Sequence, residues 1–143
     1  MAQENKELLL KDLSARLLYG VKVQINSDVK KVVGVKNGFV VTKERGLFST
    51  KEYITKIECC RPYLRPMSSM TEEEKEELLN RLPKYWGLEI DKLGDLYFDI
   101  CDASYPSIEL LTDIVDWLNA HHFDYRGLIK KGLAIEAPKG MYK

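Results

Sequence analysis

Cysteine and histidine are scarce in this sequence, and the patterns that accompany their chemistry are missing. The chain has three cysteines and two histidines among its 143 residues. Cys59 and Cys60 are adjacent, and Cys101 stands alone. This set gives neither the framework of a disulfide-rich domain nor the spacing of a zinc site. We therefore expect three reduced thiols, most of them buried.

Long hydrophobic runs and phosphate-binding loops are also missing. No run of about 18 uncharged apolar residues occurs, and acidic residues flank the N-terminal leucines, unlike the flanks of a signal peptide. The sequence contains no glycine-rich phosphate loop, GxSxG motif or DxDxDG calcium loop. We expect a soluble, cytoplasmic protein without a membrane partner, and the sequence indicates no cofactor.

The net charge of zero conceals an asymmetry along the chain. Residues 1–66 contain 13 lysines and arginines against 7 aspartates and glutamates, whereas residues 67–143 contain 9 against 15. The first part therefore carries a charge of +6 and the second a charge of −6. Parts of opposite sign can dock on each other, or the basic part can face an anionic partner such as nucleic acid. Solvated faces that segregate by chance are the simpler interpretation.

The first half of the sequence predicts a helix followed by a small antiparallel sheet. Leucines at helical spacing indicate an amphipathic helix from about residue 5 to 18, which would cover the sheet. Alternating apolar and polar residues predict strands at 21–25, 29–35, 39–42 and 53–59. Asn37-Gly38 is a preferred two-residue hairpin loop. A further turn is expected at 44–46, with Leu47 and Phe48 in a brief paired stretch.

The second half predicts two helices with an ambiguous segment between them. Thr71 and Glu74 have the spacing of a capping box, which opens a helix that ends before Pro83. Residues 84–104 fit two strands packed beside the last long helix. A helix over residues 90–96 is the alternative.

The strongest helical pattern lies in the last third of the chain. Pro106 and Ser107 suit a first helical turn, so this helix is expected to begin near residue 106. Its broad buried face is expected to comprise Ile108, Leu110, Leu111, Ile114, Val115, Trp117 and Leu118. Its opposite face is acidic. Asp124 can then cap a second short helix closed by Gly132, before extended residues 133–137.

Together these elements predict an α+β fold. An N-terminal helix is expected on a small antiparallel sheet, either strongly bent or closed as an SH3-like β-barrel, within residues 1–66. An α-rich C-terminal lobe is expected within residues 67–143. The sequence leaves open whether these parts form two lobes or one compact unit.

A dense group of chemically active side chains follows the last long helix. It comprises His121, His122, Asp124, Tyr125 and Arg126, residue types found in metal and acid–base sites. Adjacent histidines point about 100° apart on a helix, so one of them would need Asp124 and a distant carboxylate, Asp99 or Asp102, to bind a divalent metal. In the structural interpretation, one histidine caps the helix and the other residues fix the corner by hydrogen bonds. A surface for a protein partner is the third interpretation.

A second candidate surface lies where the predicted sheet ends. It comprises Lys56, Arg61, Tyr63 and Arg65, with Tyr53 beside them. Cations next to aromatic rings are what single-stranded nucleic-acid binders use for phosphates and bases. The simpler interpretation is solvated cations on a strand and tyrosines half in the core, because the sequence has no RNP motif.

Three stretches carry a resemblance to a known group of proteins. They read LLLKDLSARLLYGVKV (8–23), RPYLRPMSSMTEEEKEEL (61–78) and WLNAHHFDYRGLIKKGLAIEAPKGMYK (117–143). In these stretches, which cover roughly half of the chain, the sequence resembles short proteins of unassigned activity encoded by prophages and other mobile elements of gut bacteria. The family has proline where this chain has Leu18. The resemblance implies an accessory gene of a mobile element in a bacterial cytoplasm, but no reaction, ligand or catalytic residue.

These observations lead to three hypotheses about function. The first is a non-catalytic binding or adaptor protein of a phage-like element, which contacts a nucleic acid or a partner protein through the basic sheet edge and the corner at 122–126. The alternative is a metal-dependent hydrolase or nuclease that uses His121 or His122 with Asp124. The third is a homo-oligomer formed through the C-terminal tail.

Overall fold

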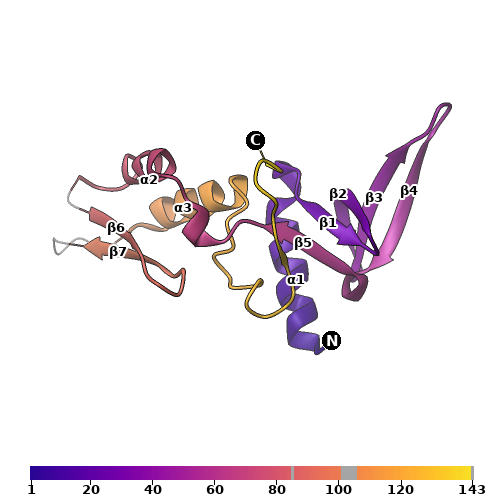
Figure 1. The fold of residues 1–143 in the computed structure, drawn as a ribbon, viewed down its shortest axis with the longest axis horizontal. Helices are drawn as coiled ribbons and strands as arrows, with labels where there is room; N and C mark the ends of the chain where they lie inside the picture. The colour runs from indigo at the N-terminus through magenta and orange to yellow at the C-terminus, as the bar shows by residue number, and fades with distance from the viewer. Residues whose placement is uncertain (85, 101–105, 143) are drawn as a thin grey trace.

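The computed structural model describes residues 1–84, 86–100 and 106–142. Within these ranges the chain is an α+β protein whose elements form two groups at opposite ends of the molecule (Figure 1). The first group comprises α1 (Gln3–Arg16), η1 (Leu17–Tyr19), β1 (Lys22–Ile25), β2 (Asp28–Lys36), β3 (Phe39–Arg45), β4 (Thr50–Lys56), η2 (Ile57–Cys59) and β5 (Cys60–Leu64). The second comprises η3 (Met67–Ser69), α2 (Glu72–Leu79), β6 (Trp86–Ile90), β7 (Leu96–Ile100) and α3 (Ile108–Ala120), and β8 (Ile135–Glu136) returns to the first.

Six strands form an open, bent sheet in the order β4-β3-β2-β1-β5-β8. Neighbouring strands are antiparallel except β5 and β8, which are parallel. The sheet bends because η2 leads from edge strand β4 to β5, four strand positions away, within three residues. The predicted SH3-like barrel is not formed by the described strands. β4 pairs with β3 alone, and β8 takes the free side of β5, so no ladder joins the two edges.

The turns of this sheet follow the sequence at one position and depart from it at another. Asn37 and Gly38 have positive φ values of 49° and 79° and form the predicted loop between β2 and β3. The turn expected at 44–46 lies instead at 46–49, where the Gly46 N–H donates to the Ser49 carbonyl oxygen at 2.8 Å. Leu47 and Phe48 are therefore the tip of the β3–β4 hairpin and not a paired stretch.

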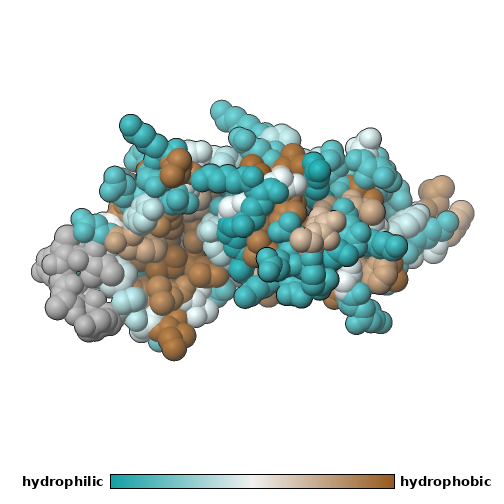
Figure 2. Space-filling model, turned by 90° about the horizontal axis from the view of Figure 1, so that it is seen from below, coloured by the Kyte–Doolittle hydropathy of each residue, from teal (hydrophilic) through white to brown (hydrophobic). Residues whose placement is uncertain are grey.

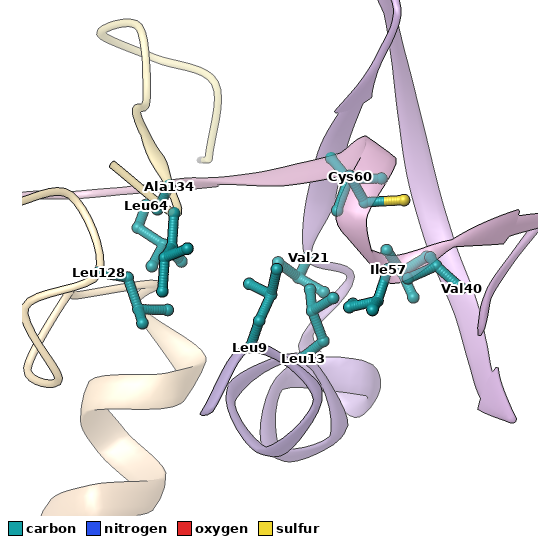
Figure 3. Packing of buried hydrophobic residues seen from close by; sticks show 12 residues of the cluster. Leu9, Leu13, Val21, Val40, Ile57, Cys60, Leu64, Leu128 and Ala134 are labelled. Carbon is teal, nitrogen blue, oxygen red and sulfur yellow. The ribbon is translucent and has the colours of Figure 1, made fainter. Parts of the chain in front are cut away.

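α1 covers one face of the sheet and forms the first hydrophobic core with it (Figure 3). The buried members of this core are Leu9, Leu13, Val21, Val23, Val32, Val40, Ile57, Cys60, Leu64, Leu128, Leu133 and Ala134. The last three come from the C-terminal segment. The end of the chain therefore returns to the first group of elements and completes its core.

The second hydrophobic core lies among α2, α3 and the β6–β7 hairpin. Its buried members are Met67, Met70, Leu78, Leu82, Trp86, Ile114, Trp117, Leu118 and Phe123. The predicted capping box of α2 is present, since Thr71 and Glu74 each accept a hydrogen bond from the backbone N–H of the other. Ser107 caps α3 by accepting from the Leu110 N–H at 3.1 Å, which confirms the predicted start of that helix.

The second half of the chain is less helical than predicted. Its described residues contain α2 and α3, but β6 and β7 pair antiparallel, as the hairpin interpretation of residues 84–104 predicts. Leu88 and Phe98 of this hairpin pack against the second core, so the helices share it with a small sheet. The lobe is therefore mixed and not α-rich. None of the described helices has the length and apolar character needed to cross a membrane.

α3 buries a narrower face than the sequence predicts. Ile114 and Trp117 face the second core, whereas Ile108, Leu111 and Val115 are 85, 43 and 37% exposed. Apolar residues lie on more than one side of this helix, but α2 and the described residues of the β6–β7 hairpin share a core with only one side. The predicted buried face is thus wrong for these three residues.

Leu13→Ala is expected to lower the free energy of unfolding by about 2–5 kcal/mol, because it leaves a cavity in the first core. Leu18→Ala is the matched control. It removes a side chain that is 92% exposed, so the change should stay within about 0.5 kcal/mol. Urea unfolding followed by circular dichroism measures both. Equal losses in the two variants would contradict the orientation of α1 and η1 on the sheet.

Candidate functional site

The segment after α3 forms a corner that is bonded to the end of β5. His121 caps α3 and stacks on Trp117 with 4.0 Å between ring centroids, and its Nδ1 lies 2.9 Å from the Trp117 carbonyl oxygen. The Arg65 N–H donates to the His122 carbonyl oxygen, and the Asp124 N–H donates to the Arg65 carbonyl oxygen, both at 2.8 Å. The corner is therefore fixed to the chain where it leaves the sheet.

His122 is buried and neutral. Its backbone is left-handed, with φ of 60°, and its ring stacks on Tyr142 with 3.6 Å between centroids. The Tyr142 hydroxyl in turn donates to the Tyr63 carbonyl oxygen at 2.8 Å and accepts from the Lys22 N–H at 2.9 Å. Burial, and secondarily the charge of Arg16, lower the pKa of His122 to about 4. The imidazole is therefore uncharged at pH 7.

Asp124 performs the predicted capping, although no helix follows it. Its Oδ1 accepts from the Leu128 N–H at 2.8 Å and its Oδ2 from the Ile129 N–H at 2.9 Å. The segment it caps consists of turns, because Gly127 has φ of 70° and so interrupts helical geometry. Gly132, also at 70°, ends these turns, whereas the sequence predicts it as the end of a helix. Backbone donors thus engage both carboxylate oxygens.

A buried ion pair joins the corner to α1. Asp12 and Arg16 are fully buried, and Nε and Nη2 of Arg16 lie 2.9 and 3.0 Å from the two Asp12 carboxylate oxygens. Nη2 also donates to the Phe123 carbonyl oxygen at 2.7 Å. Arg126 approaches the same carboxylate, with its Nε 3.3 Å from Oδ1. The Asp12 carboxylate therefore interacts with two arginines that are far apart in the sequence.

Tyr125 and Arg126 are half-buried and complete the corner. The Tyr125 hydroxyl donates to Asn119 Oδ1 at 2.9 Å and accepts from Arg126 Nη2 at 3.0 Å. The guanidinium groups of Arg16 and Arg126 lie 5.4 and 4.9 Å from the centroid of the Tyr125 ring. The structure thus brings the predicted corner residues together as a network of fixed contacts.

His121 and Asp124 are engaged by these contacts, and the His122 ring is stacked, although its buried Nδ1 has no hydrogen-bond partner among the described residues. Among residues 1–84, 86–100 and 106–142, no group of three or more His, Cys, Asp or Glu side chains could hold a metal ion. Of the two distant carboxylates considered, Asp99 lies in β7 opposite Gly87, and Asp102, like Cys101, lies outside the described residues. The described geometry therefore adds no support to the hydrolase hypothesis.

The corner reaches the surface as one wall of a hollow of about 410 Å³. Asp124 and Tyr125 belong to this wall, and η3 and residues 92–96 of the β6–β7 loop form others. Two lysines, Lys92 and Lys130, also line it. A partner protein at the corner would therefore meet a recess and not a projecting patch, and the predicted partner surface there stays a prediction.

Tyr63 and Arg65, two of the residues predicted for the basic surface, are engaged within the structure. Arg65 donates from Nη1 and Nη2 to the two Glu74 carboxylate oxygens, both at 2.7 Å, and its guanidinium lies 4.2 Å from the centroid of the Phe123 ring. The hydrogen bonds from Arg65 lower the pKa of Glu74 to about 2. Tyr63 is buried. Neither side chain is free to contact a phosphate or a base.

Lys56 and Arg61 instead lie on the sheet face opposite the first core, which we call the outer sheet face. At one end of this face, Lys56 also borders a hollow that residues of α1 line. Residues that are paired in register on neighbouring strands point to the same face of the sheet. Along each strand, the residues of the outer sheet face alternate with core residues such as Val32 and Val40. The exposed charged and apolar residues of the outer sheet face are Val29, Lys31, Val33, Lys36, Phe39, Lys43, Arg45, Glu52, Ile54, Lys56 and Arg61. Their exposure shows that no described helix covers this face.

The cations of the outer sheet face are unpaired. No salt bridge within the described residues involves Lys31, Lys36, Lys43, Arg45, Lys56 or Arg61. Four of the six arginines pair with carboxylates, namely Arg16, Arg65, Arg81 and Arg126. The remaining two both lie on this face. Within residues 22–64, all of them described, Glu52 is the one carboxylate exposed there, so the face carries net positive charge.

Sequence reasoning missed four of these cations, Lys31, Lys36, Lys43 and Arg45. The signal was present in the alternation of each strand. Lys31 precedes the core residue Val32, and Lys43 follows the buried Thr42, so both must point away from the core. Extending the alternation along every strand would have assembled the face.

Comparison of the chain with models of protein families, with curated proteins and with solved structures gave no match.

Asp12→Ala is expected to lower the free energy of unfolding by about 3–5 kcal/mol, because it leaves the Arg16 guanidinium buried without its countercharge. Replacing both residues by apolar ones, Asp12→Leu with Arg16→Met, removes that unpaired charge and should restore most of the loss. Chemical denaturation of both variants tests this. A single variant as stable as the wild type would refute the role of the pair.

Acidification from about pH 6.5 to about pH 4 is expected to destabilise the folded protein through His122. In the unfolded chain the imidazole has its ordinary pKa of 6.5 and takes up a proton in this range, whereas the folded protein keeps it neutral down to about pH 4. The contribution to stability is therefore complete above pH 6.5 and is lost as the pH falls. Unfolding free energies measured across this range report the slope.

His122→Asn removes the titrating group and suits the left-handed backbone at this position. The variant should show a smaller loss of stability between pH 6.5 and pH 4 than the wild type. Identical slopes in the two proteins would show that the folded state does not hold His122 neutral.

Proposed function

We propose that this chain is a non-catalytic nucleic-acid-binding protein that contacts the phosphate backbone with its outer sheet face. The observation that carries this proposal is the set of six exposed, unpaired cations on a sheet face that no described helix covers. Cations in such an arrangement bind phosphates and release the counterions of the nucleic acid. Phe39 and Ile54, exposed among them, add apolar surface for sugars and bases.

The charge distribution favours one orientation of the bound nucleic acid. Residues 67–143 carry a charge of −6, and Glu72, Glu73 and Asp116 on α2 and α3 are exposed. These carboxylates repel phosphates, so the second group of elements would point away from the nucleic acid. The strand or duplex would then follow the sheet.

An acidic protein is the other partner that these cations could accept. We favour nucleic acid because the cations are spread over four strands, from β2 to β5, a distribution that suits an extended polyanion. The resemblance to proteins of prophages and other mobile elements would give this activity a setting in a bacterial cytoplasm.

Replacing Lys36, Lys56 and Arg61 together by alanine is expected to weaken binding to all nucleic-acid sequences about equally. Each lost phosphate contact reduces the slope of log Kobs against log salt concentration by about 0.9 on duplex DNA, so the triple variant should lose about 2 to 3 from that slope. Fluorescence anisotropy with a labelled duplex and a labelled single strand, over a series of salt concentrations, measures affinity and slope.

The matched control replaces Lys11, Lys131 and Lys139 by alanine, which removes the same charge from exposed residues outside the outer sheet face. This variant should keep the wild-type slope. Equal losses of affinity and salt slope in the two triple variants would show that binding depends on net charge alone, which would contradict the proposal. Absence of binding by the wild type at low salt would also contradict it, and preference for an acidic polypeptide would assign the face to a protein partner.

A further inference from the structure

Two large apolar side chains stand exposed at the tip of the β3–β4 hairpin. Leu47 and Phe48 are 97 and 99% exposed, the highest values among the large hydrophobic residues that the structure describes. Figure 2 shows apolar atoms at the end of the molecule where this hairpin projects in Figure 1. Exposing leucine and phenylalanine side by side to water is unfavourable, so such a pair indicates a binding partner with an apolar region that buries them.

The residue types at this tip depart from the usual chemistry of hairpin turns. The other tight turns of the sheet use Asn26-Ser27 and Asn37-Gly38, which both begin with a polar asparagine, and Asn26, Asn37 and Gly38 have positive φ values that suit a chain reversal. Leu47-Phe48 has neither property. The turn is nevertheless narrow, because a Cβ on Gly46 would lie 2.9 Å from the Ser49 carbonyl oxygen. Local departures of this kind are expected at functional sites.

The hairpin forms an arm that reaches beyond the first core. Val40 and Thr42 of β3 are buried, but every residue from 43 to 54 is exposed. Three strand residues beyond Thr42 extend the arm by about 10 Å. This reach is similar to the depth of the grooves of duplex DNA, about 7.5–8.5 Å.

The sides of the arm are cationic. Lys43 and Arg45 belong to the outer sheet face, where Glu52 lies opposite Lys43 in register, and Lys51 lies opposite Glu44. Lys30 forms a salt bridge with Glu44 at 3.6 Å and neutralises it. The positive charge of the outer sheet face therefore continues along the arm to within two residues of the apolar tip.

We infer that this arm enters the minor groove of duplex DNA and inserts Phe48 and Leu47 between neighbouring base pairs, so that the duplex kinks. Minor-groove proteins combine cations at the groove with apolar wedges, phenylalanine and leucine among them, that partly unstack one base step. The outer sheet face would hold the adjacent backbone. This inference rests on the proposed function and specifies its ligand as duplex DNA.

The surface of an anionic membrane is the other destination that a cationic arm with an apolar tip suits. Duplex DNA is favoured because the unpaired cations continue from the arm to Lys36, Lys56 and Arg61, over strands that lie behind the tip. A bound duplex can follow these strands, whereas a flat membrane would meet the tip alone.

The test compares the full-length protein with the double variant Leu47→Ser, Phe48→Ser on a duplex labelled at both ends and carrying 2-aminopurine. Energy transfer between the ends reports bending, and 2-aminopurine fluorescence reports unstacking. The wild type should bend the duplex and raise the fluorescence. The double variant should lose both signals and no more than about tenfold in affinity, with an unchanged salt slope, because its phosphate contacts remain. The matched control, Leu18→Ser with Ile108→Ser, removes two exposed apolar side chains elsewhere and should behave as the wild type.

Each remaining outcome overturns the inference in a distinguishable way. Wild-type binding without bending or unstacking, or equal bending by the tip variant, removes the wedge and leaves the proposed function standing. No binding of nucleic acid by the wild type removes both. Vesicles containing phosphatidylserine are the membrane probe; if they bind the wild type and not the tip variant, and the duplex is not bent, the tip belongs to a membrane surface.

Discussion

A fully buried arginine connects the two groups of elements in this structure. Arg16 lies in the N-terminal helix, yet one of its nitrogens donates to the Phe123 carbonyl oxygen, 107 positions later. Asp12 compensates its charge and also meets Arg126, while Nη1 of Arg16 has no hydrogen-bond partner among the described atoms. A buried charge with so few partners is stable only in one geometry. The corner after α3 is therefore held in place by α1, and its chemistry follows from that role. His122 stays neutral beside the cation, and its ring is a stacking surface for Tyr142.

The connection between α1 and the corner determines which surfaces of the sheet stay uncovered. The α1 face carries the first core, and β8 and the C-terminal segment close the β5 edge through the Ala137 N–H, which donates to the Leu64 carbonyl oxygen at 2.7 Å. Tyr142 covers the end of the opposite face near Lys22 and Tyr63. What remains open is the outer sheet face from β2 to β4 with Arg61 beside it. The arginines follow the same division, because those that connect elements are paired with carboxylates and those on the open face are not.

Signals that depend on near neighbours in the sequence were predictable, and those that depend on distant partners were not. Asn37-Gly38 and the Thr71–Glu74 capping box act within a few residues, so they identify their turn and helix start without any tertiary information. Asp12 and Arg16, by contrast, have the i,i+4 spacing that is common on exposed helix faces, and only the distant corner makes them a buried pair at the centre of the structure. The barrel prediction failed for the same reason. Whether a sheet closes into a barrel depends on which strand pairs with its last edge. Here that strand is β8, whose two residues are too few to show a periodic sequence pattern.

Of the four residues predicted for the basic surface, Lys56 and Arg61 are exposed on the outer sheet face, whereas Tyr63 is buried and Arg65 is bonded to Glu74. Lysines on an edge such as β4 discourage pairing with another chain, so unpaired cations on the outer sheet face would be explained by solubility alone. Leu47 and Phe48 at the end of the same edge act in the opposite direction, because an exposed apolar tip promotes association. A sequence shaped only to protect its edge would place polar turn residues there, as it does at Asn37-Gly38. Cations that repel other copies of the chain, next to exposed apolar residues, favour a partner that is negatively charged and has an apolar interior. The duplex proposed above combines these properties in its phosphate backbone and its stacked bases.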